Sequence, residues 1–178
     1  EMGTALHAFL EHADFSALAA AKDAGGLEKA ILAERQRQVD RQLVAPEIAE
    51  KLDVSRIRRF VEGEAFAKIC AADEVLRELA FITALPAEAV LAAQGTEGVR
   101  AEGEQVLVQG IADLVLVYPD HLELLDYKTD RRKTEADFLR AYRAQLNLYA
   151  LAIDKRFAPK KVTYKGICSL ELGKLIEA

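Results

Sequence analysis

The sequence predicts a mixed α/β fold, in which a small sheet is flanked by helices and preceded by a helical N-terminal part. Two observations predict it. Roughly the first 80 residues are rich in helix-forming residues, with apolar positions at helical spacing. After Arg77, runs of Val, Leu and Ile are typical of strands, and one long helical pattern precedes the last of these runs.

Helices are expected first along the chain. Leu6, Phe9 and Leu10 form an apolar stripe at helical spacing, and Gly25-Gly26 interrupts the pattern. The later helices are expected at residues 27–43, from a start at Pro46, from a cap at Ser55 through Phe60, and at residues 64–72.

The second half predicts a hairpin followed by a long helix. Two apolar runs lie on either side of Tyr118-Pro119-Asp120-His121, whose Pro and Asp favour a turn. The segment before the hairpin ends in glycine-rich loop signals and is expected to be variable and partly helical. The expected elements are a strand at Arg77–Ile82, this insertion at Pro86–Gly103, strands at Gln105–Tyr118 and Leu122–Lys128, a helix at Glu135–Asp154 and a strand at Val162–Leu170.

Length and composition exclude several classes of protein. The chain has 178 residues, which fits a single domain spanning 1–178 that is either complete or part of a larger chain. No apolar run approaches the ~20 residues of a membrane span, and no signal-peptide layout suggests export. Cys70 and Cys168 are expected to be reduced thiols, and they are too few for an iron–sulfur cluster. No G-x-x-x-x-G-K-[ST] loop is present, so no ATP site is expected in this chain.

The charge is unevenly distributed. The net charge is −5, but residues 128–165 carry eleven Lys/Arg against four Asp/Glu. A basic segment on an acidic body is compatible with a polyanion that meets one face only. The alternative is that these charges lie on solvated helix faces.

Two carboxylates and a lysine are expected to converge on the hairpin. Side chains alternate along a strand, so Asp126 and Lys128 project together, while Asp113 shares a face with Gln109 and Ile111 on the preceding strand. Carboxylate oxygens suit Mg²⁺ or Mn²⁺, and a neighbouring lysine can orient a water or stabilise charge on a phosphate. These groups predict metal-assisted phosphodiester hydrolysis. A strand-end ion pair is the alternative for a D-x-K pattern taken by itself.

Five short segments, spread over nearly the whole chain, match the motifs of a known family in order: Gly3-Thr4-Ala5-Leu6-His7, Arg77-Glu78-Leu79-Ala80-Phe81, Gln109-Gly110-Ile111-Ala112-Asp113, Asp126-Tyr127-Lys128-Thr129-Asp130 and Gln145-Leu146-Asn147-Leu148-Tyr149. On these segments the sequence resembles the RecB-type nuclease domains of the PD-(D/E)XK superfamily. The motifs V-Q-G-I-A-D and L-D-Y-K-T-D-R are most similar to those of nuclease domains at the C-terminus of bacterial helicase-nuclease subunits. The resemblance implies a restriction-endonuclease-like core.

The resemblance also implies roles for individual residues. Asp113 and Asp126 are expected to ligate the metal, together with His7 and the main-chain carbonyl of Tyr127. Lys128 is expected to position the attacking water or stabilise the transition state. Without the resemblance, a helical histidine is more often a surface or core residue than a ligand.

A second group is expected to contact DNA or support the site. Gln145 and Tyr149 match the family's Q-x-x-x-Y pair on the long helix. Thr129, Arg131, Arg132 and Lys133 follow the catalytic strand and could lie at the start of the next helix and grip a phosphate, with a solvated loop as an equal alternative. Glu78 could support the site from its strand, with an edge-strand charge as the alternative. The whole group is Gln145, Tyr149, Thr129, Arg131, Arg132 and Glu78.

The implied function is a Mg²⁺-dependent deoxyribonuclease, with Mn²⁺ as a substitute, that cuts single-stranded DNA exonucleolytically in double-strand-break repair and recombination. The expected partners are helicase domains of the same chain and a second helicase-nuclease subunit, in the bacterial cytoplasm with the nucleoid and without a membrane. The rival function is a catalytically silent nuclease-fold module that binds DNA or a partner. The cluster of Arg56, Arg58 and Arg59 suits DNA or a partner domain, and the sequence leaves that choice open.

Overall fold

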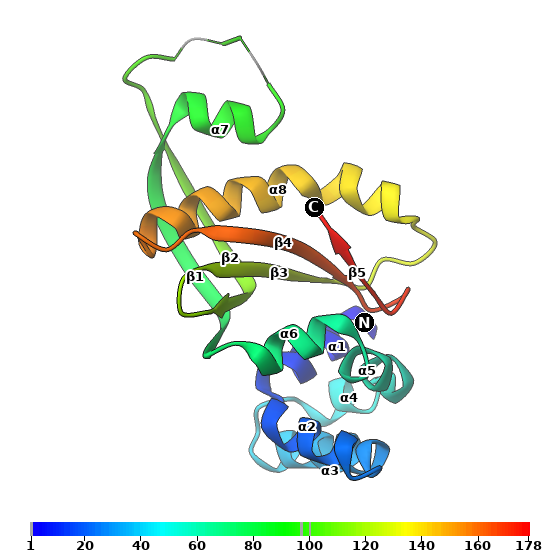
Figure 1. The fold of residues 1–178 in the computed structure, drawn as a ribbon. Helices are drawn as coiled ribbons and strands as arrows, with labels where there is room; N and C mark the ends of the chain where they lie inside the picture. Colours follow the sequence, from blue (N-terminus) through cyan, green and yellow to red (C-terminus); the bar gives the residue numbers. More distant parts are fainter. Residues whose placement is uncertain (1, 97, 100) are drawn as a thin grey trace. The chain divides into compact units, whose positions relative to one another are not determined.

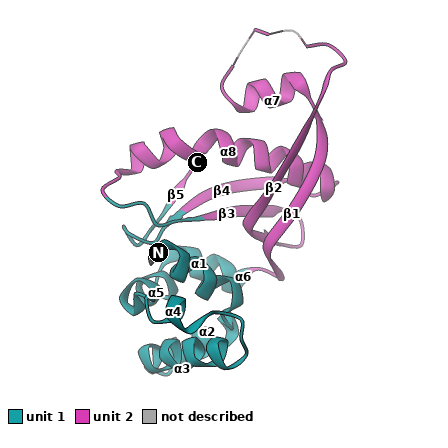
Figure 2. Ribbon diagram, turned by 180° about the vertical axis from the view of Figure 1, so that it is seen from behind, with its two compact units in different colours: residues 1–71, 127–131, 168–175 teal, residues 72–126, 132–167, 176–178 magenta. Residues whose placement is uncertain are grey.

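The computed structural model describes residues 2–96, 98–99 and 101–178 (Figure 1). The chain divides into two compact units, which Figure 2 shows in different colours. Unit 1 comprises residues 1–71, 127–131 and 168–175, and unit 2 comprises residues 72–126, 132–167 and 176–178. Each unit therefore gathers segments that are far apart in the sequence.

Unit 1 is mainly helical. Asp53 is the N-cap of a helix and accepts hydrogen bonds from the amides of Ser55 and Arg56, so the predicted cap at Ser55 is wrong by two residues. The predicted start at Pro46 is confirmed. The helices are α1 (Met2–His12), α2 (Phe15–Asp23), α3 (Leu27–Asp40), α4 (Pro46–Ala49), α5 (Val54–Val61) and α6 (Glu64–Ala71).

Aromatic rings fill the core of unit 1. Phe66 meets Phe15 and Phe60 edge to face, with ring centroids 5.6 and 5.8 Å apart. Phe60 also meets Tyr127, at 5.6 Å, and Tyr127 is only 3% exposed. Such pairs add to the stability that burial of the rings provides. The Tyr127 side chain is thereby held in place, and with it the main chain on either side.

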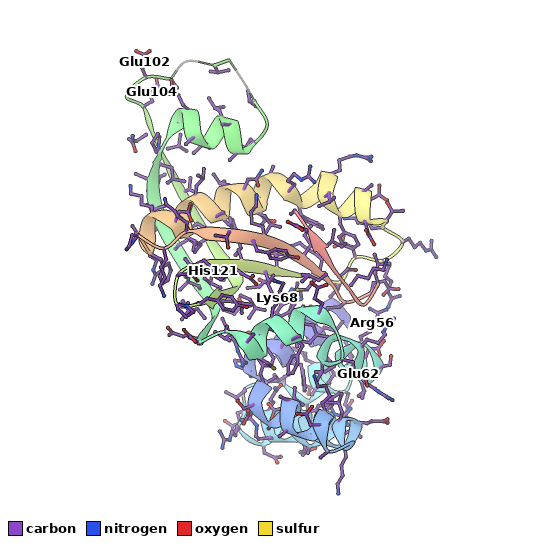
Figure 3. All side chains as sticks on the ribbon, viewed as in Figure 1. Arg56, Glu62, Lys68, Glu102, Glu104 and His121 are labelled. Carbon is purple, nitrogen blue, oxygen red and sulfur yellow. The ribbon has the colours of Figure 1, made fainter. Side chains whose placement is uncertain are left out.

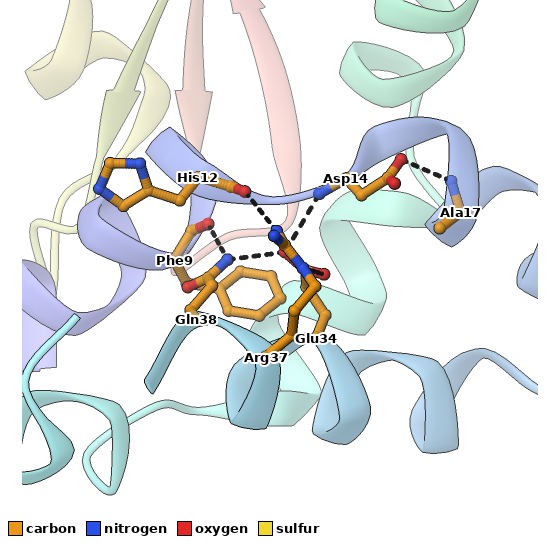
Figure 4. A network of polar contacts seen from close by, with 7 residues as sticks. All are labelled: Phe9, His12, Asp14, Ala17, Glu34, Arg37 and Gln38. Carbon is orange, nitrogen blue, oxygen red and sulfur yellow. Dashed lines mark hydrogen bonds and ion pairs between the residues drawn. The ribbon is translucent and has the colours of Figure 1, made fainter. Parts of the chain in front are cut away.

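A buried polar network holds α3 against α1 (Figure 4). Glu34 is 7% exposed and accepts hydrogen bonds from the Arg37 guanidinium, from Gln38 Nε2 at 3.0 Å and from the Asp14 amide at 3.2 Å. Arg37 and Gln38 in turn donate to the carbonyls of His12 and Phe9, at 2.9 and 3.0 Å. Every member therefore has partners, which is the condition under which a buried charge is tolerated.

The sheet has the order β1-β2-β3-β4-β5, and β1 pairs with β2 and β2 with β3 in antiparallel fashion. The Leu122 amide donates to Lys161 O and the Leu170 amide to Lys128 O, both at 2.9 Å. The first bond joins the starts of β3 and β4, and the second joins their ends, so the two strands run parallel. The strands are β1 (Glu74–Pro86), β2 (Gln105–Val117), β3 (Leu122–Lys128), β4 (Val162–Ser169) and β5 (Lys174–Glu177).

Two helices complete unit 2. Helix α8 (Glu135–Arg156) connects the parallel strands β3 and β4, and α7 (Ala87–Ala93) lies between β1 and β2 in the sequence (Figure 1). Phe138, Leu146 and Ile153 of α8 are buried in one cluster with strand residues such as Val115 and Leu124. The core of unit 2 therefore lies between α8 and one face of the sheet.

The edge strand β1 is partly covered by the end of α8. Lys155 Nζ donates to Ala84 O at 2.6 Å, and Arg156 Nη1 donates to Ala80 O at 2.8 Å. Beside them the hairpin leaves large apolar side chains in solvent, since Ile82 is 64% and Leu107 is 68% exposed.

The α/β prediction is confirmed, and so are the bounds of the strand at Leu122–Lys128. The first strand is longer than predicted because it pairs with β2 over nearly its whole length, from Glu74 to Pro86. The short strand β5 was not predicted. Within the described ranges, no helix combines the length and apolar character of a membrane span.

The Glu34 network predicts an acid-sensitive fold. Burial raises the pKa of the Glu34 carboxyl, but hydrogen bonds from Arg37, Gln38 and the Asp14 amide outweigh it, so the pKa falls below its usual 4.5. A lowered pKa in the folded state stabilises the protein above pH 4.5, and this stabilisation is lost as the pH falls through the folded-state value. We expect Glu34→Gln to cost roughly 1–3 kcal/mol at pH 7.

Urea unfolding of wild type and Glu34→Gln between pH 3 and pH 7 measures this contribution. The difference in the free energy of unfolding should shrink as the pH falls below 4.5. A difference that stays constant down to pH 3 would contradict the assignment.

Candidate functional site

Three carboxylates occur where the pairing of β1, β2 and β3 is interrupted or ends. Pairing of β1 with β2 steps from Arg77↔Leu114 to Leu79↔Ala112, so Glu78 and Asp113 are the residues between these pairs. Pairing of β2 with β3 ends at Leu114↔Leu125, so Asp113 and Asp126 are each one residue beyond the last pair. The two predicted catalytic aspartates therefore occupy corresponding positions on adjacent strands.

The strands are distorted at this level. Glu78 has a φ of 46°, in the left-handed region that non-glycine residues rarely adopt. The core cluster includes both Ala112 and Val115, which are three residues apart, so the side of β2 that faces the core changes between them. Regular alternation is interrupted beside Asp113. The face-sharing with Gln109 and Ile111 expected from alternation cannot be extended through this point.

Asp126 is a buried carboxylate. It is 5% exposed, whereas Asp113 is half-buried and Glu78 exposed. Leu122 and Leu124 belong to the core cluster, so alternation along β3 turns Asp126 toward the layer between the sheet and α8. A carboxylate in such a place is costly unless it is paired, hydrogen-bonded or bound to a cation.

Helix α8 brings the Q-x-x-x-Y pair to the same layer. Gln145 Nε2 donates to Tyr149 Oη at 3.2 Å, and the Tyr149 ring meets Phe81 edge to face at 4.9 Å. A Cβ on Gly110 would lie 2.7 Å from Tyr149 Oη and 2.8 Å from Phe81 Cζ. The glycine of the motif before Asp113 therefore leaves room for the tyrosine on α8.

Tyr142, one turn earlier on α8, has a different partner. Lys133 Nζ donates to Tyr142 Oη at 3.3 Å and lies 4.8 Å from the centre of its ring. This cation–π contact ties Tyr142 to the loop before the helix. Tyr149, which accepts the hydrogen bond from Gln145, is the tyrosine of α8 that contacts β2.

Unit 1 contributes His7 and the carbonyl of Tyr127. His7 Nδ1 lies 3.1 Å from Gly3 O and Nε2 lies 3.2 Å from Tyr127 O. A neutral imidazole carries a single N–H, so one of the two contacts sets a lone pair against a carbonyl oxygen. Adjacent ligands of an octahedral Mg²⁺ lie about 3.0 Å apart, given metal–oxygen distances of about 2.1 Å. The spacing of Nε2 and the carbonyl oxygen fits two such ligands.

The loop after β3 differs from its predicted role. The N-cap of α8 is Thr134, and Thr134 and Asp137 form a capping box there. Thr129 does not stand at the helix start; it lies against Gly3, where a Cβ would come within 2.6 Å of Thr129 Oγ1. Arg131 and Arg132 are exposed. The predicted position of Thr129 at the start of the helix is therefore wrong, because Thr134 and Asp137 cap the first turn. A phosphate contact of this loop stays a prediction.

The arginines of α5 separate into different environments. Arg56 is buried and forms ion pairs with Asp53 and Glu171, and exposed Arg58 pairs with Glu62 at 3.0 Å. Figure 3 labels Arg56 and Glu62 on this part of unit 1. Arg56 of the predicted basic cluster therefore has a structural role, because its charge is neutralised by ion pairs within unit 1.

A metal site is not complete within the part of the chain that the structure describes. Over residues 2–96, 98–99 and 101–178, no group of three or more His, Cys, Asp or Glu side chains could hold a metal ion. In unit 2 the strands β2 and β3 supply the carboxylates of Asp113 and Asp126. In unit 1, His7 lies beside the carbonyl oxygen of Tyr127. The carboxylates of unit 2 and the carbonyl oxygen of unit 1 suit a hard divalent cation, for which an imidazole is an unusual ligand.

Comparison with known proteins identifies the family. The model of the PD-(D/E)XK nuclease superfamily matches residues 1–174. The chain is 35% identical over 176 residues to the ATP-dependent helicase/nuclease AddA of Heliobacterium modesticaldum, an alignment that covers 94% of this chain and 12% of that protein. The AddA protein of Geobacillus thermodenitrificans is 34% identical over 164 residues, covering 87% of this chain and 12% of its own length.

The chain therefore belongs to the PD-(D/E)XK nuclease superfamily, and the resemblance predicted from five motifs is confirmed. Its similarity to the nuclease part of the AddA proteins is confirmed as well. The chain spans about 12% of the length of these curated relatives.

The left-handed conformation of Glu78 predicts that two substitutions there differ in stability. Glycine adopts this conformation without strain, whereas alanine does not. Glu78→Gly should therefore be more stable than Glu78→Ala by about 1–2 kcal/mol, although both remove the same carboxylate. Thermal or urea unfolding of the two variants measures this, and equal stabilities would mean that the backbone is not strained there.

The close approach at Gly110 predicts a local defect. Gly110→Ala should displace Tyr149, break its contact with Gln145 and cost roughly 1–3 kcal/mol. The matched control is Gln109→Ala, an exposed neighbour on β2, which should change the free energy of unfolding by less than about 0.5 kcal/mol. Urea unfolding compares them; equal effects would show that α8 does not depend on this contact.

Proposed function

We propose that this chain is a metal-dependent DNA nuclease. The observation that supports the proposal is the register of the sheet, in which Asp113 and Asp126 are each one residue beyond the pair Leu114↔Leu125 and Glu78 and Asp113 lie between two pairs of β1 and β2. Membership of the PD-(D/E)XK nuclease superfamily supports the same chemistry. The reaction is hydrolysis of a phosphodiester bond.

The metal ligands in this proposal are Asp113, Asp126, His7 Nε2 and the carbonyl oxygen of Tyr127, with Mg²⁺ as the metal and Mn²⁺ as a substitute. Support comes from the burial of Asp126 and from the 3.2 Å separation of the two donors in unit 1. A divalent ion supplies a lowered pKa for a bound water and neutralises charge that develops on the phosphate.

The chain's own side chains have separate tasks in this proposal. Lys128, two residues after Asp126 on β3, orients the water or stabilises the charged phosphate. Gln145 and Tyr149 contact the DNA backbone or hold the lysine, and their mutual hydrogen bond pre-sets the tyrosine hydroxyl. Glu78 supports the site from β1, and its strained backbone is typical of a functional position.

The substrate and partners follow from the name of the relatives, which describes an ATP-dependent helicase/nuclease. We propose that the chain cuts single strands exonucleolytically as helicase domains of the same polypeptide unwind them, in the repair of double-strand breaks and in recombination. The same proposal includes a second helicase-nuclease subunit, together with a location in the bacterial cytoplasm with the nucleoid.

The rival is a silent nuclease-fold module that binds DNA without cutting it. Asp113, Asp126 and Lys128 are all present in this chain, whereas a silent member of the family would be expected to have lost some of them. The complete set therefore favours cleavage.

Substitution of the aligned aspartates tests the proposal. We expect Asp113→Asn and Asp126→Asn to lower metal-dependent cleavage of single-stranded DNA by about a thousandfold or more, because the metal contributes several kcal/mol to the reaction. Both should also weaken Mn²⁺ binding in calorimetry. The matched control is Asp120→Asn, which removes the same charge from the turn before β3, where Asp120 is 86% exposed.

Cleavage by Asp126→Asn at the rate of Asp120→Asn would refute the assignment of the site. Binding of single-stranded DNA by the wild type, without cleavage in Mg²⁺ or Mn²⁺, would favour the silent module instead.

A further inference from the structure

Unit 2 contains an open groove between the end of α7 and the first half of α8, with a volume of about 500 Å³. Gln94 and Gly95 follow α7 on one side, and Arg140, Arg143 and Asn147 come from α8 on the other. Among the residues that the structure describes, no Asp or Glu lines it. The polar side chains of the groove are therefore basic or amide groups, set among apolar residues of α7 and α8.

Positive charge accumulates along this groove. Arg140 is 80% exposed and reaches Asp137 only at 3.5 Å, at the opposite end from Asn147. Arg143 is exposed, and among residues 2–96, 98–99 and 101–178 its guanidinium has no ion pair or hydrogen bond. Lys165 of β4 contacts the Asn147 side chain from below, and burial together with the charge of Arg143 lowers the pKa of Lys165. These like charges repel one another unless an anion joins them.

Neither Arg140 nor Arg143 is needed as a hydrogen-bond partner for the carbonyl groups at the end of α7. The last carbonyls of a helix attract cations, and those of α7 face this groove. Each of them already has a donor: the amide of Gln94 reaches Val90 O and Leu91 O, that of Gly95 reaches Ala92 O, and Asn147 Nδ2 reaches Ala93 O. The end of α7 is therefore satisfied without Arg140 or Arg143.

We propose that this groove binds the phosphate backbone of a single DNA strand on its way to or from the nuclease site, an inference that rests on the proposed function. Arg140, Arg143 and Asn147 are three and four residues apart on one face of α8, over about 11 Å of helix. Arginine is well suited to phosphate because its guanidinium presents several donors in one plane.

The same helix carries the groove and part of the candidate site. Tyr149 contacts Gly110 of β2, whereas Arg143 and Asn147 line the groove beside α7. A strand held along the groove is thus guided by the helix that positions the Q-x-x-x-Y pair. This arrangement assigns strand guidance to α8 in addition to support of the site.

Salt-dependent binding tests the proposal directly. Fluorescence anisotropy with a labelled single-stranded oligonucleotide of about 12 nucleotides, in EDTA so that no cleavage occurs, gives affinity over a series of NaCl concentrations. The logarithm of the affinity falls linearly with the logarithm of the salt concentration, and each lost phosphate contact makes this slope less steep by about 0.7 for single strands. We expect Arg140→Gln and Arg143→Gln each to weaken binding several-fold and to lower the slope by about this amount.

Two further variants sharpen the test. Arg41→Gln removes the same charge from an exposed position at the end of α3 and should bind the strand like the wild type. Arg143→Lys keeps the charge and should restore most of the salt dependence. The groove assignment alone would be overturned if the double variant Arg140→Gln/Arg143→Gln had the same salt slope as the wild type while the wild type cleaved DNA. Absence of both binding and Mn²⁺-dependent cleavage in the wild type would overturn the proposed function and this inference with it.

Discussion

The contact of Tyr149 with Gly110 sets the orientation of α8, and most of unit 2 depends on it. The tyrosine ring fits against β2 only because Gly110 has no side chain, and Phe81 closes the space from β1. Once this face of the helix is fixed on the sheet, the rotation of the whole helix is determined, since side chains recur every 3.6 residues. One close approach therefore decides which residues meet the core and which meet α7.

Opposite charges are segregated in unit 2 as a result. Acidic side chains lie where the pairing of β1, β2 and β3 is interrupted or ends, and arginines lie on the side of α8 that faces α7. Burial of Asp126, and the like charges of Arg143 and Lys165 beside the groove, both require compensation by partners. A divalent cation would relieve the acidic side chains and a polyanion would relieve the basic groove, so substrate and metal would each stabilise the part of the fold that holds them.

Much of this arrangement could be predicted from the sequence, for physical reasons that differ between elements. The bounds of β3 follow from its apolar composition, and Asp126 and Lys128 stand out because they are charged residues in such a strand. The left-handed Glu78 could not be predicted, because alternation assumes a regular strand and nothing in the residue itself favours a positive φ. Strand β5 has four residues, too few to show a period.

The network of Glu34, Arg37 and Gln38 was missed for another reason. At helical spacing it looks like a solvated charged face, and only the approach of α1 buries it. The groove beside α7 was missed because Arg140 and Arg143 lie in a run of charge, and their common face becomes distinct only when the rotation of α8 is known. The spacing of these arginines with Asn147 is the signal that was available.

The cations at the end of α8 also decide how the hairpin meets other surfaces. Edge strands invite further strands through their unused backbone groups, the first step toward fibrous aggregation. Lys155 and Arg156 occupy two carbonyls of β1, so an incoming strand would have to displace charge-assisted hydrogen bonds. The exposed Ile82 and Leu107 nearby thus remain open to sideways packing but are shielded from strand exchange, a safeguard for colloidal stability that lies outside the chemistry of the site.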